Sequence, residues 1–472
     1  MRKQQRIKSN PLFRSPLISS RGGSAFGGKG GMGGLVVEKL AINGGIPVRK
    51  KPLPPEYPGG MVIGKEEKTE ILEVIEAKSP YRYYGPHPLA KVKTFEREFA
   101  EKMGTRYALA VSSGTAALKV ALAALGVGPG DEVIIPAVTF LACVGATVMS
   151  RAIPVFAEVD KSLTLDPDDF AAKITKRTKV VMPVHLQGVP CKMDEIITIA
   201  KRCGIKVLED CAQSCGASYG GRKVGSIGNV GIFSLQFNKI ITSGEGGVVV
   251  TNDTKIYERA VRAHDHGVIR PSTGQILGVY QKDAFISENY RMGEIAGAMA
   301  RAQLRKLNQI ITTLRSYKKQ IKDAISDIKN VEFRQIPDEK GQVGFTIVFY
   351  LPNGEKAHKF IKALNAENIG AYQLYGGDPV YAYPQVLNQR TVTKDRCPFN
   401  CLFSSAKIKY RMGMCPKSED LLSRSVWIPI SILLTPNDIK DIIKAIRKVH
   451  YNLFYTRVSK KPLCHSERSV AK

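Results

Sequence analysis

Short apolar runs alternate with amphipathic stretches between residues 107 and 209, and this alternation limits the possible folds more than any other feature. The apolar runs have the length of strands, and the stretches between them have helical periodicity. Strands that alternate with helices pair in parallel, because each crossover helix returns the chain to the same end of the sheet. We therefore expect an α/β fold with a mostly parallel central sheet. Its predicted strands are 107–111, 132–135, 154–158, 179–184, 206–209, 228–235 and 247–251.

The pattern changes at residue 294, where a long helical stretch begins. After it come only a few strands, near 331–334 and 344–350, and a closing helix over 436–453. This mixture predicts a second, smaller α+β unit. We predict four segments: a basic glycine-rich tail over 1–36, a large α/β domain with an N-terminal arm over 37–305, a small α+β domain over 306–456, and a basic tail over 457–472.

The charge of the chain is strongly basic, with 70 Lys and Arg against 42 Asp and Glu and a formal net charge of +28. Residues 1–30 hold +7 of it and residues 457–472 hold +4, which leaves +17 on the rest of the chain. A basic surface suits nucleic acid or an anionic small substrate. The sequence has no helix-turn-helix, zinc-finger or RNA-recognition pattern, so we expect no nucleic-acid partner.

Targeting and redox signals favour a cytoplasmic protein without a membrane segment. The longest apolar stretch, 116–127, contains Lys119 and is too short to span a bilayer. Residues 1–30 lack the continuous apolar segment of a signal peptide. Without such a signal, the nine cysteines are expected to be reduced. Three of them fall in one loop with a spacing unlike that of paired zinc ligands, so we expect no metal; they are Cys397, Cys401 and Cys415.

A turn of small residues, Ser112-Ser113-Gly114-Thr115-Ala116, connects the strand 107–111 to a predicted helix. Free backbone N–H groups and the helix dipole at such a start favour a bound phosphate. The alternative is an ordinary strand-to-helix turn with Thr115 near the N-cap. A second feature is the pair Glu209-Asp210, which closes an apolar strand. Parallel sheets bind ligands at this end of their strands, although an acid there can also cap a helix.

A single lysine, Lys239, stands in the loop that leaves the strand 228–235, and the glycine-rich turn 243–247 follows it. An amine in this place could form a Schiff base with a carbonyl compound, whereas an isolated lysine is ordinarily a solvated surface charge. A fourth feature, Asn289-Tyr290-Arg291, precedes the long helical stretch and has the ordinary reading of a helix start.

The order and spacing of these four features resemble those of the DegT/StrS-type family of pyridoxal-phosphate sugar aminotransferases. The matching pieces are Ser113-Gly114-Thr115, Glu209-Asp210-Cys211-Ala212-Gln213, Phe233-Ser234 to Lys239, Gly244 to Gly247, and Asn289-Tyr290-Arg291. The opening Leu40-Ala-Ile-Asn-Gly-Gly45 is similar too, so the resemblance covers residues 40–455. It implies the fold type I of pyridoxal-phosphate enzymes, with an aspartate-aminotransferase-like large domain and a smaller C-terminal domain. It also implies pyridoxal 5'-phosphate as the cofactor.

The resemblance assigns Lys239 a double role, because the lysine that holds the cofactor also moves the proton during amino transfer. Family members that dehydrate sugars carry His at this position, so Lys239 argues for transamination. Asp210 would face the pyridine nitrogen, and Gln213 would reach the phenolic oxygen of the cofactor. The phosphate would be bound by Ser234 and by the turn residues Gly114, Thr115 and Ala116.

Three further residues have a place in this scheme. Phe140 matches the aromatic residue that stacks on the cofactor ring, with a core position as the alternative. Asn289 in this family reaches the phosphate in the neighbouring subunit, which implies a homodimer with shared active sites. His185 ends another predicted strand and would either touch substrate or have a structural role.

We therefore expect an enzyme that moves an amino group from L-glutamate or L-glutamine to a keto sugar, sugar nucleotide or cyclitol ketone. Its product would serve polysaccharide or aminosugar biosynthesis. The alternatives are a sugar dehydratase that uses the same cofactor and a non-catalytic regulatory protein, the latter suggested by the basic charge. The loops 268–285 and 372–416, which match no motif, are expected to determine the acceptor.

Overall fold

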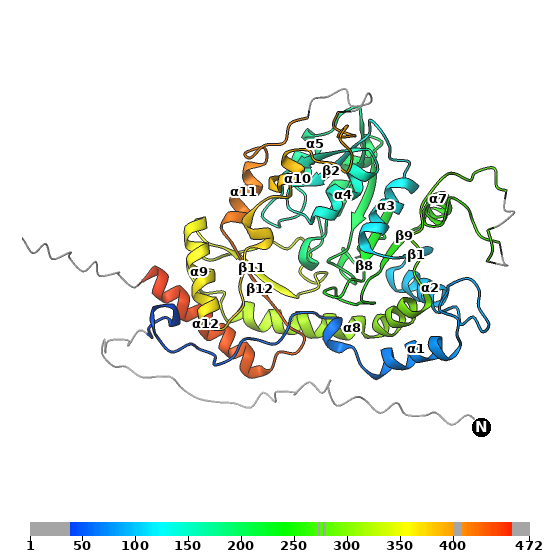
Figure 1. Ribbon diagram of the computed structural model, residues 1–472. Helices are drawn as coiled ribbons and strands as arrows, with labels where there is room; N and C mark the ends of the chain where they lie inside the picture. Colours follow the sequence, from blue (N-terminus) through cyan, green and yellow to red (C-terminus); the bar gives the residue numbers. More distant parts are fainter. Residues whose placement is uncertain (1–37, 272–273, 277–279, 401–407, 456–472) are drawn as a thin grey trace, which may run out of the picture. The chain divides into compact units, whose positions relative to one another are not determined.

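The computed structural model describes residues 38–271, 274–276, 280–400 and 408–455 (Figure 1). The predicted tails over 1–36 and 457–472, together with Cys401, lie outside these ranges. The described residues from Lys39 onward form one unit. No helix of the described ranges is long and apolar enough to cross a membrane.

The central feature is a seven-stranded sheet with the strand order β1-β9-β8-β5-β4-β2-β3. Neighbouring strands from β3 to β8 pair in parallel, whereas β9 pairs antiparallel with both β8 and β1. The predicted mostly parallel α/β sheet is thus confirmed. Its strands are β1 (Tyr107–Val111), β2 (Glu132–Pro136), β3 (Ile153–Ala157), β4 (Thr178–Val181), β5 (Lys206–Asp210), β8 (Val230–Ser234) and β9 (Gly247–Thr251).

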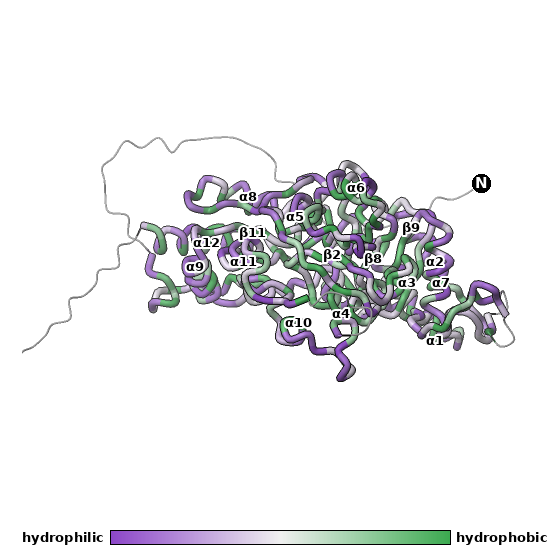
Figure 2. The backbone as a smooth tube through the Cα atoms, turned by 90° about the horizontal axis from the view of Figure 1, so that it is seen from above, coloured by the Kyte–Doolittle hydropathy of each residue, from purple (hydrophilic) through white to green (hydrophobic). Residues whose placement is uncertain are grey.

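Helices cover both faces of this sheet, so its central strands are buried on both sides. One face packs on α3 (Gly114–Ala124) and α7 (Thr254–His264), while the other packs on α6 (Met193–Arg202), α2 (Lys91–Met103) and α8 (Glu294–Asp323). The side chains of β2 show the division, because Val133 and Ile135 join the first cluster and Ile134 joins the α6 cluster. Hydrophobic segments accordingly gather around β2 and β8 in Figure 2.

A second, antiparallel sheet has the order β10-β11-β12. The long helix α8 packs against α1 and α2 and also reaches α12, and the predicted boundary between residues 305 and 306 lies within this helix. The division into a large and a small domain stays a prediction. The elements of this part are β10 (Glu332–Phe333), β11 (Thr346–Tyr350), α9 (Gly354–Ala366), α10 (Pro384–Leu387), α11 (Pro416–Ser423), β12 (Ser425–Pro429) and α12 (Pro436–Phe454).

Several elements were not anticipated from the sequence. The helix α7 begins at Asp253, whose carboxylate accepts the N–H groups of Lys255 and Ile256 as an N-cap. The strand β12 pairs with β11 over a long sequence separation, and such a partner leaves no local signal. The hairpin of β6 (Ser218–Tyr219) and β7 (Arg222–Lys223) was not anticipated either. The remaining helices lie where the sequence pattern indicates helices, and they are α1 (Lys65–Glu76), α4 (Leu141–Met149) and α5 (Pro167–Ala172).

Candidate active site

A cavity of about 540 Å³ lies at the carboxyl ends of β1, β5 and β8. This is the edge at which open parallel sheets bind ligands. The cavity brings together seven of the ten residues that the sequence predicted for the site. They are Gly114, Thr115, Phe140, Asp210, Gln213, Ser234 and Lys239.

The helix α3 points its N-terminus at the cavity. Ser113 is the N-cap, and its hydroxyl accepts the N–H of Ala116 at 3.0 Å. The N–H groups of Gly114 and Thr115 have no intrahelical partner at this end and border the cavity. The cap is therefore Ser113 rather than Thr115, and the N–H of Ala116, which the sequence offered to a phosphate, is used inside the turn.

Ser234 closes the same corner from the end of β8. A Cβ atom on Gly114 would lie 2.8 Å from Cβ of Ser234, so only glycine allows this approach. The serine hydroxyl and the start of α3 thus meet in one small pocket. Hydroxyl and free N–H groups at a helix N-terminus are the groups that bind a phosphate.

Asp210 presents its carboxylate to the cavity from the last position of β5. Its Oδ1 accepts the N–H of Ala212 at 2.9 Å, and its Oδ2 accepts the thiol of Cys143 at 3.0 Å. Burial and the neighbouring Asp210 hold the pKa of the Cys143 thiol well above its usual range. Cys143 therefore stays protonated and can donate this hydrogen bond, which orients the carboxylate.

Glu209, the other acid of the pair, points away from the cavity and is fully buried. Its two oxygens accept the N–H groups of Gly225, Ile227 and Gly228 at 2.6–2.8 Å, and a ring nitrogen of His185 lies at 3.1 Å. The strand end therefore separates the two acids: Glu209 anchors the loop before β8, and Asp210 serves the cavity.

His185 is also fully buried and does not line the cavity. Its Nδ1 accepts the N–H of Cys191 at 3.0 Å, so Nε2 carries the hydrogen and donates to Glu209. The structure thus gives His185 structural contacts and no path to a substrate. His185, Glu209 and Cys211 are close enough to hold a metal, but backbone N–H groups already occupy both Glu209 oxygens.

Lys239 lies in the loop between β8 and β9 and borders the cavity. The backbone fixes its position, because its N–H donates to Gln236 and its carbonyl accepts the N–H of Gly59. Burial lowers the pKa of the Lys239 ammonium below its ordinary value, although Asp210 and Glu245 oppose this effect. A lowered pKa increases the fraction of neutral amine, which is the nucleophilic form.

Gln213 is held at the cavity wall by two contacts. Its Oε1 accepts the backbone N–H of Gln187 at 3.0 Å, and its Nε2 donates to the hydroxyl of Tyr375 at 3.1 Å. One hydrogen of its amide remains for another acceptor. On a further wall, Phe140 is 58% exposed, which rules out the core position that was its alternative. A ring left open beside a cavity can stack on a flat ligand.

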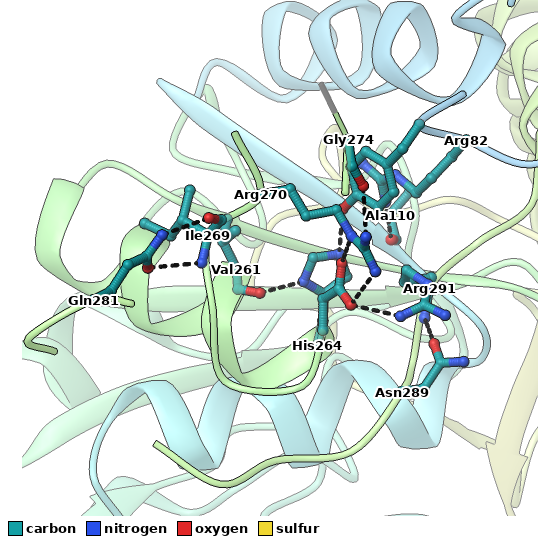
Figure 3. Close-up of polar contacts among 12 residues, drawn as sticks. Arg82, Ala110, Val261, His264, Ile269, Arg270, Gly274, Gln281, Asn289 and Arg291 are labelled. Atoms are coloured by element: carbon teal, nitrogen blue, oxygen red, sulfur yellow. Dashed lines mark hydrogen bonds and ion pairs between the residues drawn. The ribbon is translucent and has the colours of Figure 1, made fainter. Parts of the chain in front are cut away.

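Asn289 does not line this cavity. It belongs to a cluster in which Asp265 pairs with both Arg270 and Arg291, at 2.5 Å each (Figure 3). Although partial burial opposes it, these two cations lower the pKa of Asp265. The Oδ1 atom of Asn289 accepts the N–H of Arg291. Burial, reinforced by Arg82, lowers the pKa of the adjacent His264 to about 3, so the imidazole is neutral.

The cavity also contains residues that the sequence motifs did not identify. Glu56 and Tyr57 come from the arm that precedes α1, and Tyr372 and Tyr375 come from the segment after α9. The last two fall in the loop 372–416 that was expected to determine the acceptor. The arm gave one weak signal, because the run of prolines around Glu56 predicts an extended segment without a helix. Gln187 and Cys143 carried no signal of their own.

Comparison with known proteins gives a consistent result. The model of the DegT/DnrJ/EryC1/StrS aminotransferase family matches residues 62–409. The L-glutamine:2-deoxy-scyllo-inosose aminotransferase of Streptomyces kanamyceticus is 34% identical over 88% of this chain and 97% of its own length. GDP-perosamine synthase of Escherichia coli O157:H7 is 40% identical, but the match spans half of this chain and 64% of that enzyme. An aminotransferase structure from Psychrobacter cryohalolentis superposes with a TM-score of 0.73 at 28% identity, covering 85% of this chain and 100% of that one.

Proposed function

Because the chain belongs to the DegT/DnrJ/EryC1/StrS aminotransferase family, we propose that it is a pyridoxal-phosphate-dependent aminotransferase of sugar biosynthesis. One observation carries the proposal: the Lys239 amine and the Asp210 carboxylate border the same cavity as the start of α3 and Ser234. The first pair suits an aldehyde and a pyridine nitrogen, and the second suits a phosphate. Pyridoxal phosphate combines these three groups in one molecule.

The residues present fit this cofactor at both ends. The glycine at position 114 leaves room between α3 and Ser234, and the hydroxyl of Ser234 and the N–H groups of Gly114 and Thr115 would bind the phosphate. Gln213 has a free amide hydrogen for the phenolic oxygen, and Phe140 would cover one face of the ring. Pyridoxal phosphate, when bound, supplies an aldehyde that takes up the amino group and a ring that accepts the electrons of the donor's Cα–H bond.

Lys239 and Asp210 would then divide the proton transfers. The Lys239 amine would hold the aldehyde of the bound cofactor and would accept the proton from Cα of the amino donor. Its lowered pKa favours this work, because a neutral amine accepts protons. Asp210 would favour a proton on the ring nitrogen, and the Cys143 thiol orients its carboxylate.

For the substrates we propose L-glutamate or L-glutamine as the donor and a keto sugar, sugar nucleotide or cyclitol ketone as the acceptor. The relatives support these classes, since one is named a glutamine:scyllo-inosose aminotransferase and another a GDP-perosamine synthase. Dehydration is less well supported, because the cavity presents Lys239 where a dehydratase of this type would carry histidine. A cytoplasmic location stays a prediction.

We further propose a homodimer in which Asn289 completes the phosphate site of the other subunit. In its own subunit Asn289 lies outside the cavity lining, and the Asp265–Arg291 pair holds its segment in place. Analytical ultracentrifugation measures the assembly state. An Asn289→Ala variant that stays dimeric and binds the cofactor as tightly as the wild type would contradict the shared site.

The proposed function is tested by absorbance spectroscopy of the purified protein with pyridoxal phosphate. We expect a yellow band that depends on Lys239 and disappears when L-glutamine or L-glutamate is added. The Lys239→Ala variant should show neither change. A bound cofactor that no amino acid converts would point to dehydration, and a protein that binds no pyridoxal phosphate would refute the proposal.

A further inference from the structure

Gln187 has an unusual backbone conformation at the cavity wall. Its φ and ψ of 51° and 42° lie in the left-handed region, which is rare for a residue with a long side chain. Such conformations persist only where the surroundings enforce them, and they are concentrated at functional sites. The conformation therefore requires an explanation from the residues around it.

The turn that contains Gln187 is fixed on both sides. The carbonyl of Leu186 accepts a hydrogen bond from Arg334, and the carbonyl of Gly188 accepts the N–H of Val343 at 2.8 Å. A Cβ on Gly188 would lie 2.7 Å from the side chain of Val343, so this side of the turn is closely packed. The backbone of Gln187 cannot relax to an ordinary conformation without breaking these contacts.

The side-chain amide of Gln187 lacks a hydrogen-bond partner among the described residues. It lines the cavity, and its Oε1 is buried and has no hydrogen-bond partner among the described residues. Its backbone N–H, in contrast, is used by Gln213. Most buried polar atoms have a partner, so an orphaned amide oxygen beside a cavity points to a ligand that supplies one.

The chemistry of the missing partner is defined by the orphaned atom. The unpartnered atom is an amide oxygen, so it needs a hydrogen-bond donor. A carboxylate has no hydrogen to give to this oxygen, whereas a hydroxyl has one. The side-chain amide of L-glutamine could give a hydrogen too, and the separate donor and acceptor experiments below distinguish that case. Of the two proposed substrates, the ketone acceptor is the one that carries hydroxyl groups next to its reacting carbon.

We infer that Gln187 is a specificity-determining residue, whose carboxamide hydrogen-bonds a hydroxyl of the ketone acceptor beside the carbonyl to be aminated. The inference rests on the proposed aminotransferase function. It separates the two halves of the reaction: the acceptor step depends on the amide, and the donor step does not. The strained turn serves to hold the amide at the cavity wall.

The test uses the full-length enzyme in two single-turnover experiments. In the first, L-glutamine or L-glutamate is mixed with the cofactor-loaded protein, and the loss of the yellow band is timed. In the second, the enzyme with aminated cofactor is mixed with 2-deoxy-scyllo-inosose, and the return of the yellow band is timed. As a second probe of the same step in reverse, the enzyme loaded with pyridoxal phosphate is mixed with GDP-perosamine, and the loss of the band is timed. The variants are Gln187→Leu, which keeps the volume, and Gln187→Gly, which accepts a positive φ without strain.

We expect both variants to convert the donor within about threefold of the wild-type rate and to slow the acceptor step about 10- to 100-fold, as when a buried hydroxyl loses its hydrogen-bond partner. Calorimetry provides a readout besides activity: the Kd of 2-deoxy-scyllo-inosose for the aminated enzyme should rise by a similar factor. Gln187→Asn, which keeps an amide, should fall between the wild type and Gln187→Leu.

Two outcomes would overturn the inference. Equal slowing of both steps in the Gly variant would make Gln187 a structural residue. An unchanged acceptor step would exclude the hydrogen bond. Failure of the wild type to convert any amino donor is a different result, because it refutes the proposed function itself.

Discussion

Replacement of Glu209 by glutamine tests whether the buried acid of the strand end is an anchor. The wild-type carboxylate accepts three backbone N–H groups and one imidazole N–H, and it is fully buried. Glutamine has nearly the same shape but replaces one acceptor oxygen with an NH₂ group. At least one N–H donor would then face another donor, and no water can enter to compensate.

The magnitude follows from these contacts. Removing one partner from a buried, charge-assisted group costs about 3–5 kcal/mol. The entropy of unfolding near 60 °C is about 2.1 cal/mol/K per residue, or roughly 0.8 kcal/mol/K for about 400 folded residues. The melting temperature of Glu209→Gln should therefore fall by about 4–6 °C. The loop before β8 should loosen with it, and cofactor binding through Asp210 should weaken.

Differential scanning calorimetry of the cofactor-free protein measures the first effect, with Glu355→Gln as the matched control. Glu355 lies on the surface of α9 in an exposed pair with Lys359, so the same substitution there should cost less than about 0.5 kcal/mol. If Glu209→Gln melts within 1 °C of the control, the buried carboxylate is not an anchor, and the division of roles between Glu209 and Asp210 is wrong.

Three further measurements follow from the same structure. Gly114→Ala would bring a Cβ to 2.8 Å from Ser234, so the affinity of this variant for pyridoxal phosphate should drop at least tenfold. The control Gly145→Ala, where the new Cβ meets open space, should bind normally. Equal affinities of the two variants would contradict the phosphate pocket. The rate at which the cofactor-free enzyme binds pyridoxal phosphate should rise with pH, and the midpoint of this rise should lie below 10.5 because burial lowers the pKa of Lys239. A midpoint at or above 10.5 would refute that cause. Burial also lowers the pKa of Lys318 to about 7. Between about pH 7 and 10.5 the unfolded chain then binds one proton more than the folded protein, so the free energy of unfolding should rise with pH by up to about 1.4 kcal/mol per pH unit. Lys318→Met should be more stable than the wild type at pH 7, and urea titrations should show that it lacks this slope. An unchanged slope would show that Lys318 is charged in the folded protein.

The sequence predicted the parallel part of the sheet well because its signals are local. The strands β2, β3 and β4 are each an apolar run followed by a helical period, and the predicted ranges differ from the observed ones by a few residues. The strand β12 was missed for the opposite reason, since its partner β11 stands 75 residues or more away. The antiparallel insertion of β9 between β8 and β1 has no local signature either.

The site divides in the same way. Residues in a motif with fixed spacing, such as Asp210 and Lys239, border one cavity in the structure, and their roles there stay predictions. The strand pattern alone could not tell which acid of the pair turns inward, because adjacent residues of a strand point to opposite faces and either face could have carried the ligand. The family resemblance chose Asp210, and Asp210 is the acid that lines the cavity. Gln187 escaped notice since its distinguishing property is a backbone angle and an unpaired atom, neither of which the residue type records.

The basic surplus of the chain has to be separated from the chemistry of the cavity. Among the described residues, the charged ones that line it are Lys239 and the three acids Glu56, Asp210 and Glu245, so the part of the wall that they form is not basic. Charges beyond about 8–10 Å are largely screened at physiological salt, so the surplus outside the lining adds little to the binding of a seated substrate. The basic charge of the chain can therefore speed the diffusion of an anionic acceptor to the protein, but it does not supply cationic contacts in the part of the cavity described for this subunit. A neutral hydroxylated ring needs no cation, and in our inference it is bound by a hydrogen bond to the Gln187 amide. The phosphates of a nucleotide acceptor would need cationic side chains at the cavity rim or on a second subunit.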